Sequence, residues 1–466
     1  MNYQLVELQV LYAFLLLSTV VILAFRTTTH IRINQHGPQQ QQQLHRSSFD
    51  RNTLYSTNIN INDAFVIPSD LYEHRCYYQP CLQKTTRSLN DKKDHYEYPL
   101  LVICIGMAQT ITQYQFHVRY LAQNRNVLLY QAEGLGLHYH NMYTSTTGTT
   151  TDCSTTDCST ATATVASNIS SSHPNISLRY QAMQLRQAIC YFYFNQNRTS
   201  EETDFSNDRT LTTVTPISAT VIAAHIIPSI HVDIVGFSLG GRIALAFIVI
   251  QFTKKPELDE NVNICIRKVH LTGVSIRRSP YGTVQGMIWA DLLWQNRHNN
   301  QNDLRSFGWS ILSAAYSPNF LYQNRQYLHQ WVQSVCSSHT SNGILHLIEQ
   351  AYEHENDPTN PWSVENMIQQ ISSLLSNDSN NNNNATIQFR CLVGEFDVLA
   401  LPEHVSEMVH TLRNHTSTST TTTTSTVVII VDDVVVPNVG HAVPIESSRF
   451  WRDDIQSYIS AGDGLN

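Results

Sequence analysis

Of the 466 residues, 42% are hydrophobic and only 14% are charged, so the chain has enough apolar material for a folded core. The net charge of −8, without any run of Lys or Arg, excludes a nucleic-acid-binding protein, because binding to phosphates requires a basic surface. The nine cysteines include no C-x-x-C spacing, and His138-Tyr139-His140 lacks a third ligand, so neither a metal nor a cofactor is expected.

Residues 5–25 form a mostly apolar segment of about 20 residues, the length that a helix needs to cross a bilayer. We expect an uncleaved, single-pass membrane anchor, because Lys and Arg are absent before the segment and no small-x-small cleavage site follows it. A cleaved secretory or organelle-targeting signal is the alternative. Arg26 and Arg32 favour a cytoplasmic C-terminal part, whereas N-x-S/T sequons such as Asn168 favour the lumen, so the orientation stays open.

The segment 27–62 is too polar to bury a core and is predicted to be a tether. Similar tracts occur between the periodic segments and are predicted to be dispensable surface insertions: 144–172, 199–215, 377–384 and 416–426. Cys76 and Cys81 could form a disulfide across the loop between them. The predicted organisation is an anchor or signal (1–26), a tether and lead-in (27–95), a first core segment (96–274), a helical cap (275–386) and a second core segment (387–466).

Between the polar tracts, apolar runs alternate with helical segments, which is typical of a parallel sheet covered by helices on both faces. Strands are expected at 99–105, 126–130, 232–235, 268–272, 387–393 and 427–431, and helices at 112–124, 178–194 and 447–459. Residues 275–376 are helical in pattern and rich in aromatic residues, most of which we expect to pack inside the cap. A few are expected to line a substrate cleft.

Residues 232–252 carry the strongest local signal. An apolar run leads into Gly236-Phe237-Ser238-Leu239-Gly240-Gly241, and an apolar helical segment that begins with Arg242 follows. This order predicts a buried strand that turns sharply into a helix, with Ser238 at the turn and glycines where a Cβ would clash. The free N–H groups of the helix would favour negative charge beside the serine. The alternative is a glycine-rich turn of an ordinary doubly wound sheet with a bystander serine.

A nucleophilic serine needs a base that is oriented by a carboxylate, and both follow later strands of the predicted sheet. Asp397 follows the strand at 387–393, and His441 follows the last strand. Asp397 could instead cap a helix, with Glu395 as a substitute acid, and His441 could be a surface loop residue. The expected donors to an oxyanion are the backbone N–H groups of Met107 and Leu239.

These motifs resemble the α/β-hydrolase fold family over about 98–459 without the insertions, with Ser238, Asp397 and His441 at the family's nucleophile, acid and base positions. The run from Gly236 to Arg242 is similar to the branch that holds the menaquinone-pathway lyase and the carboxylesterases of biotin synthesis. In that lyase, an arginine at the Arg242 position helps to hold a carboxylated substrate, so the resemblance implies substrate contacts at Arg242 and Phe237. Two departures are Ile105, in place of the usual His of His-Gly, and Gln131-Ala132-Glu133-Gly134, in place of Asp-x-Arg-Gly.

The expected fold is therefore an α/β-hydrolase fold, a mostly parallel, doubly wound sheet with an inserted helical cap and an N-terminal transmembrane helix. The expected function is that of a membrane-tethered serine esterase that cleaves a carboxylic ester or thioester of a small-molecule acyl substrate. One alternative is a lyase that uses the same three residues for proton abstraction. The other is a non-catalytic binding protein, because a fold does not by itself imply an activity.

Overall fold

A computed structural model describes residues 65–68, 73–82, 99–136, 177–201, 229–253, 262–298, 303–357, 359–377, 387–414 and 429–461. All of these residues belong to one unit, Ile61–Asn466. The predicted anchor at 5–25, the tether and nearly all of the polar insertion tracts lie outside the described residues. Within the described ranges, no helix combines the length and the apolar character that crossing a membrane requires.

An eight-stranded sheet forms the centre of the described core, in the order β1-β2-β4-β3-β5-β6-β7-β8. Strands β1 and β2 are antiparallel to their neighbours, and β4, β3, β5, β6, β7 and β8 run parallel to one another. The prediction of a mostly parallel sheet is confirmed. The strands are β1 (Phe65–Pro68), β2 (Glu73–Gln79), β3 (Leu100–Cys104), β4 (Val127–Tyr130), β5 (Ser229–Phe237), β6 (Asn263–Thr272), β7 (Ile387–Gly394) and β8 (Ile429–Val436).

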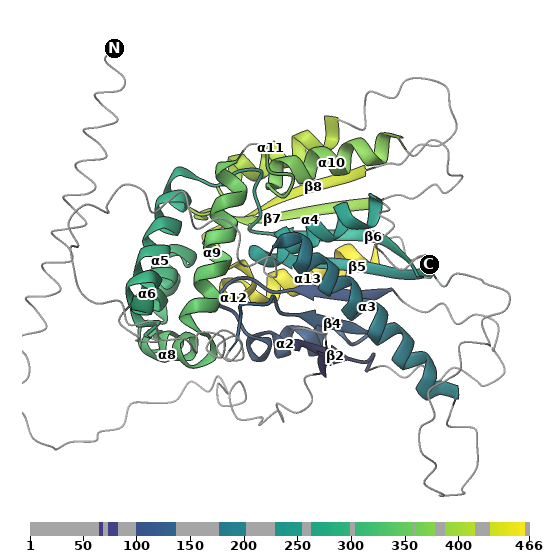
Figure 1. Cartoon of the computed structure of the whole chain (residues 1–466), viewed down its shortest axis with the longest axis horizontal. Helices are drawn as coiled ribbons and strands as arrows, with labels where there is room; N and C mark the ends of the chain where they lie inside the picture. The colour runs from purple at the N-terminus through teal and green to yellow at the C-terminus, as the bar shows by residue number, and fades with distance from the viewer. Residues whose placement is uncertain are drawn as a thin grey trace, which may run out of the picture. The chain divides into compact units, whose positions relative to one another are not determined.

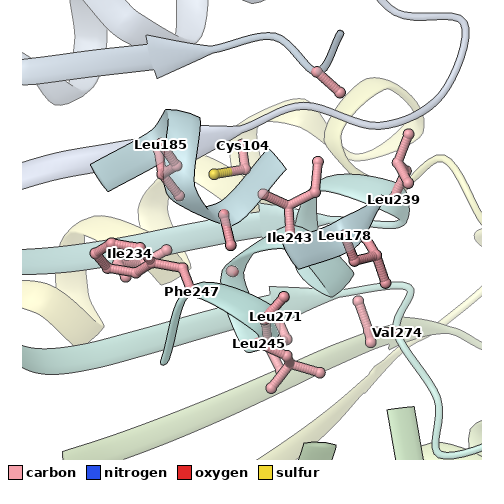
Figure 2. Close-up of a cluster of buried hydrophobic side chains, with 14 of the residues drawn as sticks. Cys104, Leu178, Leu185, Ile234, Leu239, Ile243, Leu245, Phe247, Leu271 and Val274 are labelled. Atoms are coloured by element: carbon pink, nitrogen blue, oxygen red, sulfur yellow. The ribbon is translucent and has the colours of Figure 1, made fainter. Parts of the chain in front are cut away.

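Helices cover both faces of the sheet, which explains why its strands appear in the sequence as continuous apolar runs. On β3, the side chains of Leu101 and Ile103 pack with α2 (Ile111–Leu121) and α13 (Ser448–Ser460). The alternate residues Val102 and Cys104 face the opposite cluster. Figure 2 shows the part of that cluster around α4. The helices on this second face are α3 (Leu178–Glu201), α4 (Leu239–Phe252), α10 (Val364–Asn377) and α11 (Pro402–Asn414).

Helices also fill the connection between β6 and β7, and Figure 1 shows them together at one end of the sheet. These cap helices are α5 (Pro280–His298), α6 (Arg305–Ala315), α7 (Pro318–Gln323), α8 (Leu328–Ser338) and α9 (Ser341–Asn356). Helix α10, which falls within the predicted cap segment, packs instead against α4 and α11. Aromatic rings stabilise the cap: Tyr316, Phe320 and Trp331 stack with centroids 5.4 to 5.9 Å apart.

The structure also differs from the sequence expectations in the sheet and at one cysteine pair. Strands β1 and β2 lie inside the predicted polar lead-in and were not expected as strands. Strand β6 begins at Asn263, and not at residue 268. Its first half alternates buried with exposed or partly exposed side chains, so it lacks the continuous apolar run by which the strand was predicted. Cys76 and Cys81 are free thiols, since Cys76 is buried in β2 opposite Tyr130 while the Cys81 thiol lies 3.4 Å from the Gln123 carbonyl.

Candidate active site

The turn between β5 and α4 holds Ser238 in an uncommon conformation, with φ +52° and ψ −116°. Such backbone strain persists only where the surrounding structure enforces it. The enforcing contact is the close approach of α4 to β3, because a Cβ on Gly240 would lie 2.1 Å from the Cys104 carbonyl oxygen. A Cβ on Gly236 would lie 2.4 Å from the Gly241 Cα. The glycines therefore provide space, and the serine takes the strained angles.

The three predicted side chains meet in one hydrogen-bonded series. His441 Nε2 lies 2.9 Å from Ser238 Oγ, and His441 Nδ1 lies 2.8 Å from Asp397 Oδ2. The other carboxylate oxygen, Oδ1 of Asp397, accepts the backbone N–H groups of Leu399 at 2.9 Å and Ala400 at 2.8 Å. The carboxylate is buried, so these two N–H groups fix its orientation. Asp397 thus accepts local backbone hydrogen bonds, as a helix-capping residue does, and also binds the histidine.

The His441 ring is enclosed by its neighbours. Its centroid lies 5.3 Å from that of Phe237, and a Cβ on Gly273 would come within 2.8 Å of His441 Cε1. Phe237 was expected to contact the substrate, but its ring is buried and lies outside the lining of the pocket beside Ser238. The reason is that the residue ends β5 with its ring packed under His441 and against Gly106. Phe237 therefore supports the histidine.

Glu395, the alternative acid, has a different role. Its side chain is exposed, and Oε2 accepts the backbone N–H of Asn438 at 2.8 Å. The neighbouring Phe396 N–H donates to the Val439 carbonyl at 2.9 Å. These bonds join the loop after β7, which carries Asp397, to the loop after β8, which carries His441. Glu395 thus fixes the relative positions of the two loops.

The predicted oxyanion donors line the same pocket as the serine. Leu239 is the first residue of α4, and Met107 follows β3 in a short loop in which Ala108 has φ +58°. Both residues line the pocket together with Ser238. The loop is held by Gln109, whose Oε1 accepts the Gly106 N–H at 3.0 Å and the Tyr114 hydroxyl at 2.8 Å. Sequence reasoning missed Gln109, because neither of its two bonds leaves a recognisable pattern in the sequence.

The pocket beside Ser238 combines an apolar wall with two cations. Arg242, on α4, and Arg278, just before α5, both line it. Burial and the positive charge of Arg278 lower the pKa of Arg242 to about 9. Trp289 is fixed in the wall because its Nε1 donates to Ser310 Oγ at 3.1 Å. The other apolar lining side chains are Met107, Leu239, Val274, Ile348, Ala351, Leu399 and Ala400. Arg278 is a pocket residue that the sequence reasoning did not identify.

No metal centre accompanies these residues within the described part of the chain, where no group of three His, Cys, Asp or Glu side chains could hold an ion. His138 and His140, considered as ligands from the sequence, lie outside the described residues. The described pocket brings together Ser238, His441 and the two arginines, with the Asp397 carboxylate hydrogen-bonded to the histidine behind them.

The strand order and the places of the three side chains decide the fold. The strand order is 1-2-4-3-5-6-7-8, and β2 is antiparallel to its neighbours. The serine turn follows β5, the acid follows β7 and the histidine follows β8. The chain has the α/β-hydrolase fold. The sequence matches no protein-family model and no curated protein.

Solved structures with a similar course of the chain were found at low identity. MGS-M2, an α/β-hydrolase enzyme from a Medee basin deep-sea metagenome library, is 14% identical, with a TM-score of 0.47 and coverage of 84% of this chain and 96% of its own. A hydrolase from Pseudomonas aeruginosa PA01 is 12% identical, with a TM-score of 0.48 and coverage of 86% and 100%. MenH from S. aureus is 13% identical, with a TM-score of 0.44 and coverage of 82% and 97%. The fold assignment rests on the topology above.

Proposed function

We propose that this protein is a serine hydrolase that cleaves a carboxylic ester or thioester through an acyl-enzyme. The observation that carries the proposal is the continuous series of hydrogen bonds, 2.8 Å from Asp397 to His441 and 2.9 Å from His441 to Ser238. These distances allow a proton to pass between Oγ and Nε2. A binding protein would have no need of a strained serine whose hydroxyl lies against a histidine oriented by a buried carboxylate.

The proposed reaction has two halves. His441 Nε2 takes the proton of Ser238 Oγ as Oγ attacks the carbonyl carbon, and the Met107 and Leu239 N–H groups hold the oxyanion. His441 then gives this proton to the leaving alcohol or thiol as its bond to the carbonyl carbon breaks, which leaves the acyl group on Ser238. Water, deprotonated by His441, attacks the acyl carbon. His441 then gives this proton to Ser238 Oγ as the bond between Oγ and the acyl carbon breaks, so the acid product leaves and the serine hydroxyl is regenerated. Asp397 stays ionised and holds the histidine tautomer.

The pocket supports a substrate whose acyl part is small, largely apolar and itself carries a carboxylate. Val274, Trp289 and Ile348 offer the apolar contacts. Arg242 and Arg278 both line the same pocket and carry positive charge there, and a guanidinium binds a carboxylate through charge-assisted hydrogen bonds. The same feature favours the second candidate function, a lyase of the menaquinone-pathway type, because an arginine at the Arg242 position holds a carboxylated substrate there. In that reaction the three residues would abstract a proton instead of forming an acyl-enzyme.

Labelling with a fluorophosphonate and turnover of an ester panel test these proposals together. The panel pairs neutral esters with half-esters of dicarboxylic acids of equal chain length. We expect Ser238 to be labelled, the half-esters to be preferred, and Ser238→Ala to abolish labelling and turnover. Arg242→Ala should raise KM for the half-ester more than for its neutral partner. Labelling without any ester turnover would favour the lyase, and a folded protein with neither property would leave only the binding protein.

We also propose that residues 5–25 tether the enzyme to a membrane as a single-pass anchor. The support is the length and apolar character of the segment, followed by a polar stretch that could not itself hold a bilayer. Alkaline carbonate extraction of the expressed chain is the test, and we expect the protein in the pellet. Recovery in the supernatant, with an N-terminus mapped beyond Arg26, would establish a cleaved signal instead.

A further inference from the structure

The short helix α12 (Val443–Glu446) follows the loop of His441 and ends in a carboxylate that faces the cap. Oε1 of Glu446 accepts the backbone N–H of Gly440 at 2.9 Å and that of Ser317 at 3.1 Å. Oε2 accepts the Ser317 hydroxyl at 2.6 Å. Gly440 directly precedes His441, and Ser317 is the N-cap of cap helix α7. One side chain therefore binds the backbone of the histidine loop and the cap at the same time.

The cap also packs directly on this loop. The Ala442 N–H donates to the Ala315 carbonyl, at the end of α6, at 2.9 Å. A Cβ on Gly440 would lie 2.7 Å from the Ser317 nitrogen and 2.8 Å from Glu446 Oε1. Position 440 therefore has no room for a side chain. The corner between α6 and α7 thus contacts the loop on both sides of His441, at Gly440 and at Ala442.

Keeping a carboxylate at this place is unfavourable by itself. Burial raises the pKa of Glu446, and the charge of Asp397 raises it further, while the bonds from Ser317 and Gly440 lower it only in part. A partly buried charge that faces a second carboxylate is tolerated where its hydrogen bonds achieve something that an apolar side chain could not. Here they hold the backbone next to His441.

We propose that Glu446 is a positioning residue that fixes His441 by tying its loop to the cap. The inference rests on the serine-hydrolase function proposed above. Glu446 is absent from the lining of the pocket, so it acts through the Gly440 backbone and through Ser317. Reaction geometry depends steeply on such positioning, since a displacement of about 1 Å can lower a rate about 100-fold. If the cap moved away from the histidine loop, His441 would therefore also be displaced.

Two substitutions of Glu446 in the full chain separate geometry from charge. Glu446→Gln keeps an oxygen that accepts both N–H groups, and its amide can donate to the Ser317 oxygen, so kcat should stay within about threefold of the wild type. Glu446→Ala loses all three bonds, and kcat should fall about 100-fold with KM changed less than about twofold. Tyr120→Phe, which removes a hydrogen bond to Asp453 far from the pocket, should change neither constant. Fluorophosphonate labelling rates should follow kcat.

A double-mutant cycle tests the connection to the cap. Ser317→Ala should lower kcat in the wild type but have no further effect in the Glu446→Ala chain, because the bond it removes is already gone. Ser317→Ala also removes the N-cap hydrogen bond of α7. Thr340→Ala, which removes the analogous N-cap hydrogen bond of α9 to Gly343, is the control for that loss, and its effect should be equal in both backgrounds. If Glu446→Ala fails to fold, Ser317→Ala and Glu446→Gln in the wild type still test the inference.

The inference is overturned if folded Glu446→Ala keeps wild-type kcat, if Glu446→Gln loses as much as Glu446→Ala, or if the Ser317→Ala loss is additive in the cycle. It is also overturned if Ser317→Ala has no effect on kcat in an otherwise wild-type chain. Failure of the serine-hydrolase proposal is distinguishable, because it would appear as absence of labelling and turnover in the wild type itself.

Discussion

Replacing Asp397 by Asn should stop the reaction while leaving the structure intact. Oδ1 of Asp397 accepts two backbone N–H groups, from Leu399 and Ala400, so the amide oxygen of Asn must take that position. The amide NH₂ then occupies the place of Oδ2, 2.8 Å from His441 Nδ1. Because an amide NH₂ is only a donor, Nδ1 must become the acceptor and the ring proton must move to Nε2. The histidine would then donate to Ser238 and could no longer take its proton.

The expected loss follows from this tautomer change. In serine hydrolases, the wrong tautomer with unchanged geometry lowers kcat about 10⁴-fold, which corresponds to about 5 kcal/mol of transition-state stabilisation. The melting temperature should stay within a few degrees of the wild type, because Asn keeps the two backbone bonds. Loss of activity without loss of stability is the combined signature.

The assay is kcat on the best ester of the panel, together with the rate of fluorophosphonate labelling and the melting temperature. Glu395→Gln is the matched control, because it also neutralises a carboxylate in the same loop and keeps an acceptor for the Asn438 N–H. Its kcat should stay within about threefold of the wild type. The reasoning is refuted if Asp397→Asn keeps more than a tenth of kcat, or if Glu395→Gln loses as much.

Three further changes test the scaffold, each by urea or thermal denaturation. Gly240→Ala should lower the free energy of unfolding by more than about 3 kcal/mol, because its Cβ would meet the Cys104 and Ile105 carbonyl oxygens at 2.1 and 2.7 Å, whereas Gly308→Ala meets a Val332 methyl group at 3.1 Å and should have a smaller effect. Burial acts to raise the pKa of Asp454, but hydrogen bonds from His270 and Arg390 lower it from 3.8 to about 2, so Asp454→Asn should destabilise by about 2 kcal/mol at neutral pH and the difference should fade as the pH drops from about 4 towards 2. Equal free energies of unfolding for the wild type and Asp454→Asn at neutral pH would contradict this. Excising residues 144–172 should shift the melting temperature by no more than a few degrees, and a larger fall would show that the tract packs on the core.

The serine turn and the parallel strands could be predicted because their signals are local. A strand buried on both faces needs an apolar residue at nearly every position. Helix α4 needs glycine at position 240, because a Cβ there would lie 2.1 Å from the Cys104 carbonyl oxygen of β3. The meeting of Ser238, Asp397 and His441 then follows from topology, since the carboxyl ends of parallel strands lie at one edge of the sheet. Sequence and general rules of sheet structure were sufficient for that part of the site.

The parts that were missed depend on tertiary contacts. Strand β2 mixes polar and apolar residues and has its place only because it pairs with β4. Phe237 sits beside the serine in sequence, yet whether its ring enters the pocket or packs under His441 depends on where the loop after β8 arrives. Arg278 lies 40 residues along the chain from Ser238 and enters the pocket only because α5 returns across it. Such encounters leave no periodic pattern for a sequence to reveal.

Gly440 shows how a correct sequence clue can have a different physical cause. A glycine before a candidate catalytic histidine is naturally taken as a turn residue, needed for a left-handed conformation. Among the described glycines with positive φ are Gly134, Gly136 and Gly273, but Gly440 has no such angle. What Gly440 lacks room for is a Cβ, because the Ser317 nitrogen would lie 2.7 Å from it. The requirement for glycine therefore comes from a cap residue more than 120 positions earlier, held there by Glu446 through bonds that span 129 and 6 positions. A Gly440→Ala chain should accordingly reproduce the kinetic defect of Glu446→Ala, since both separate the cap from the histidine loop. Because the φ of Gly440 is not positive, its backbone conformation alone would leave alanine tolerated, so wild-type kinetics in Gly440→Ala would refute this account.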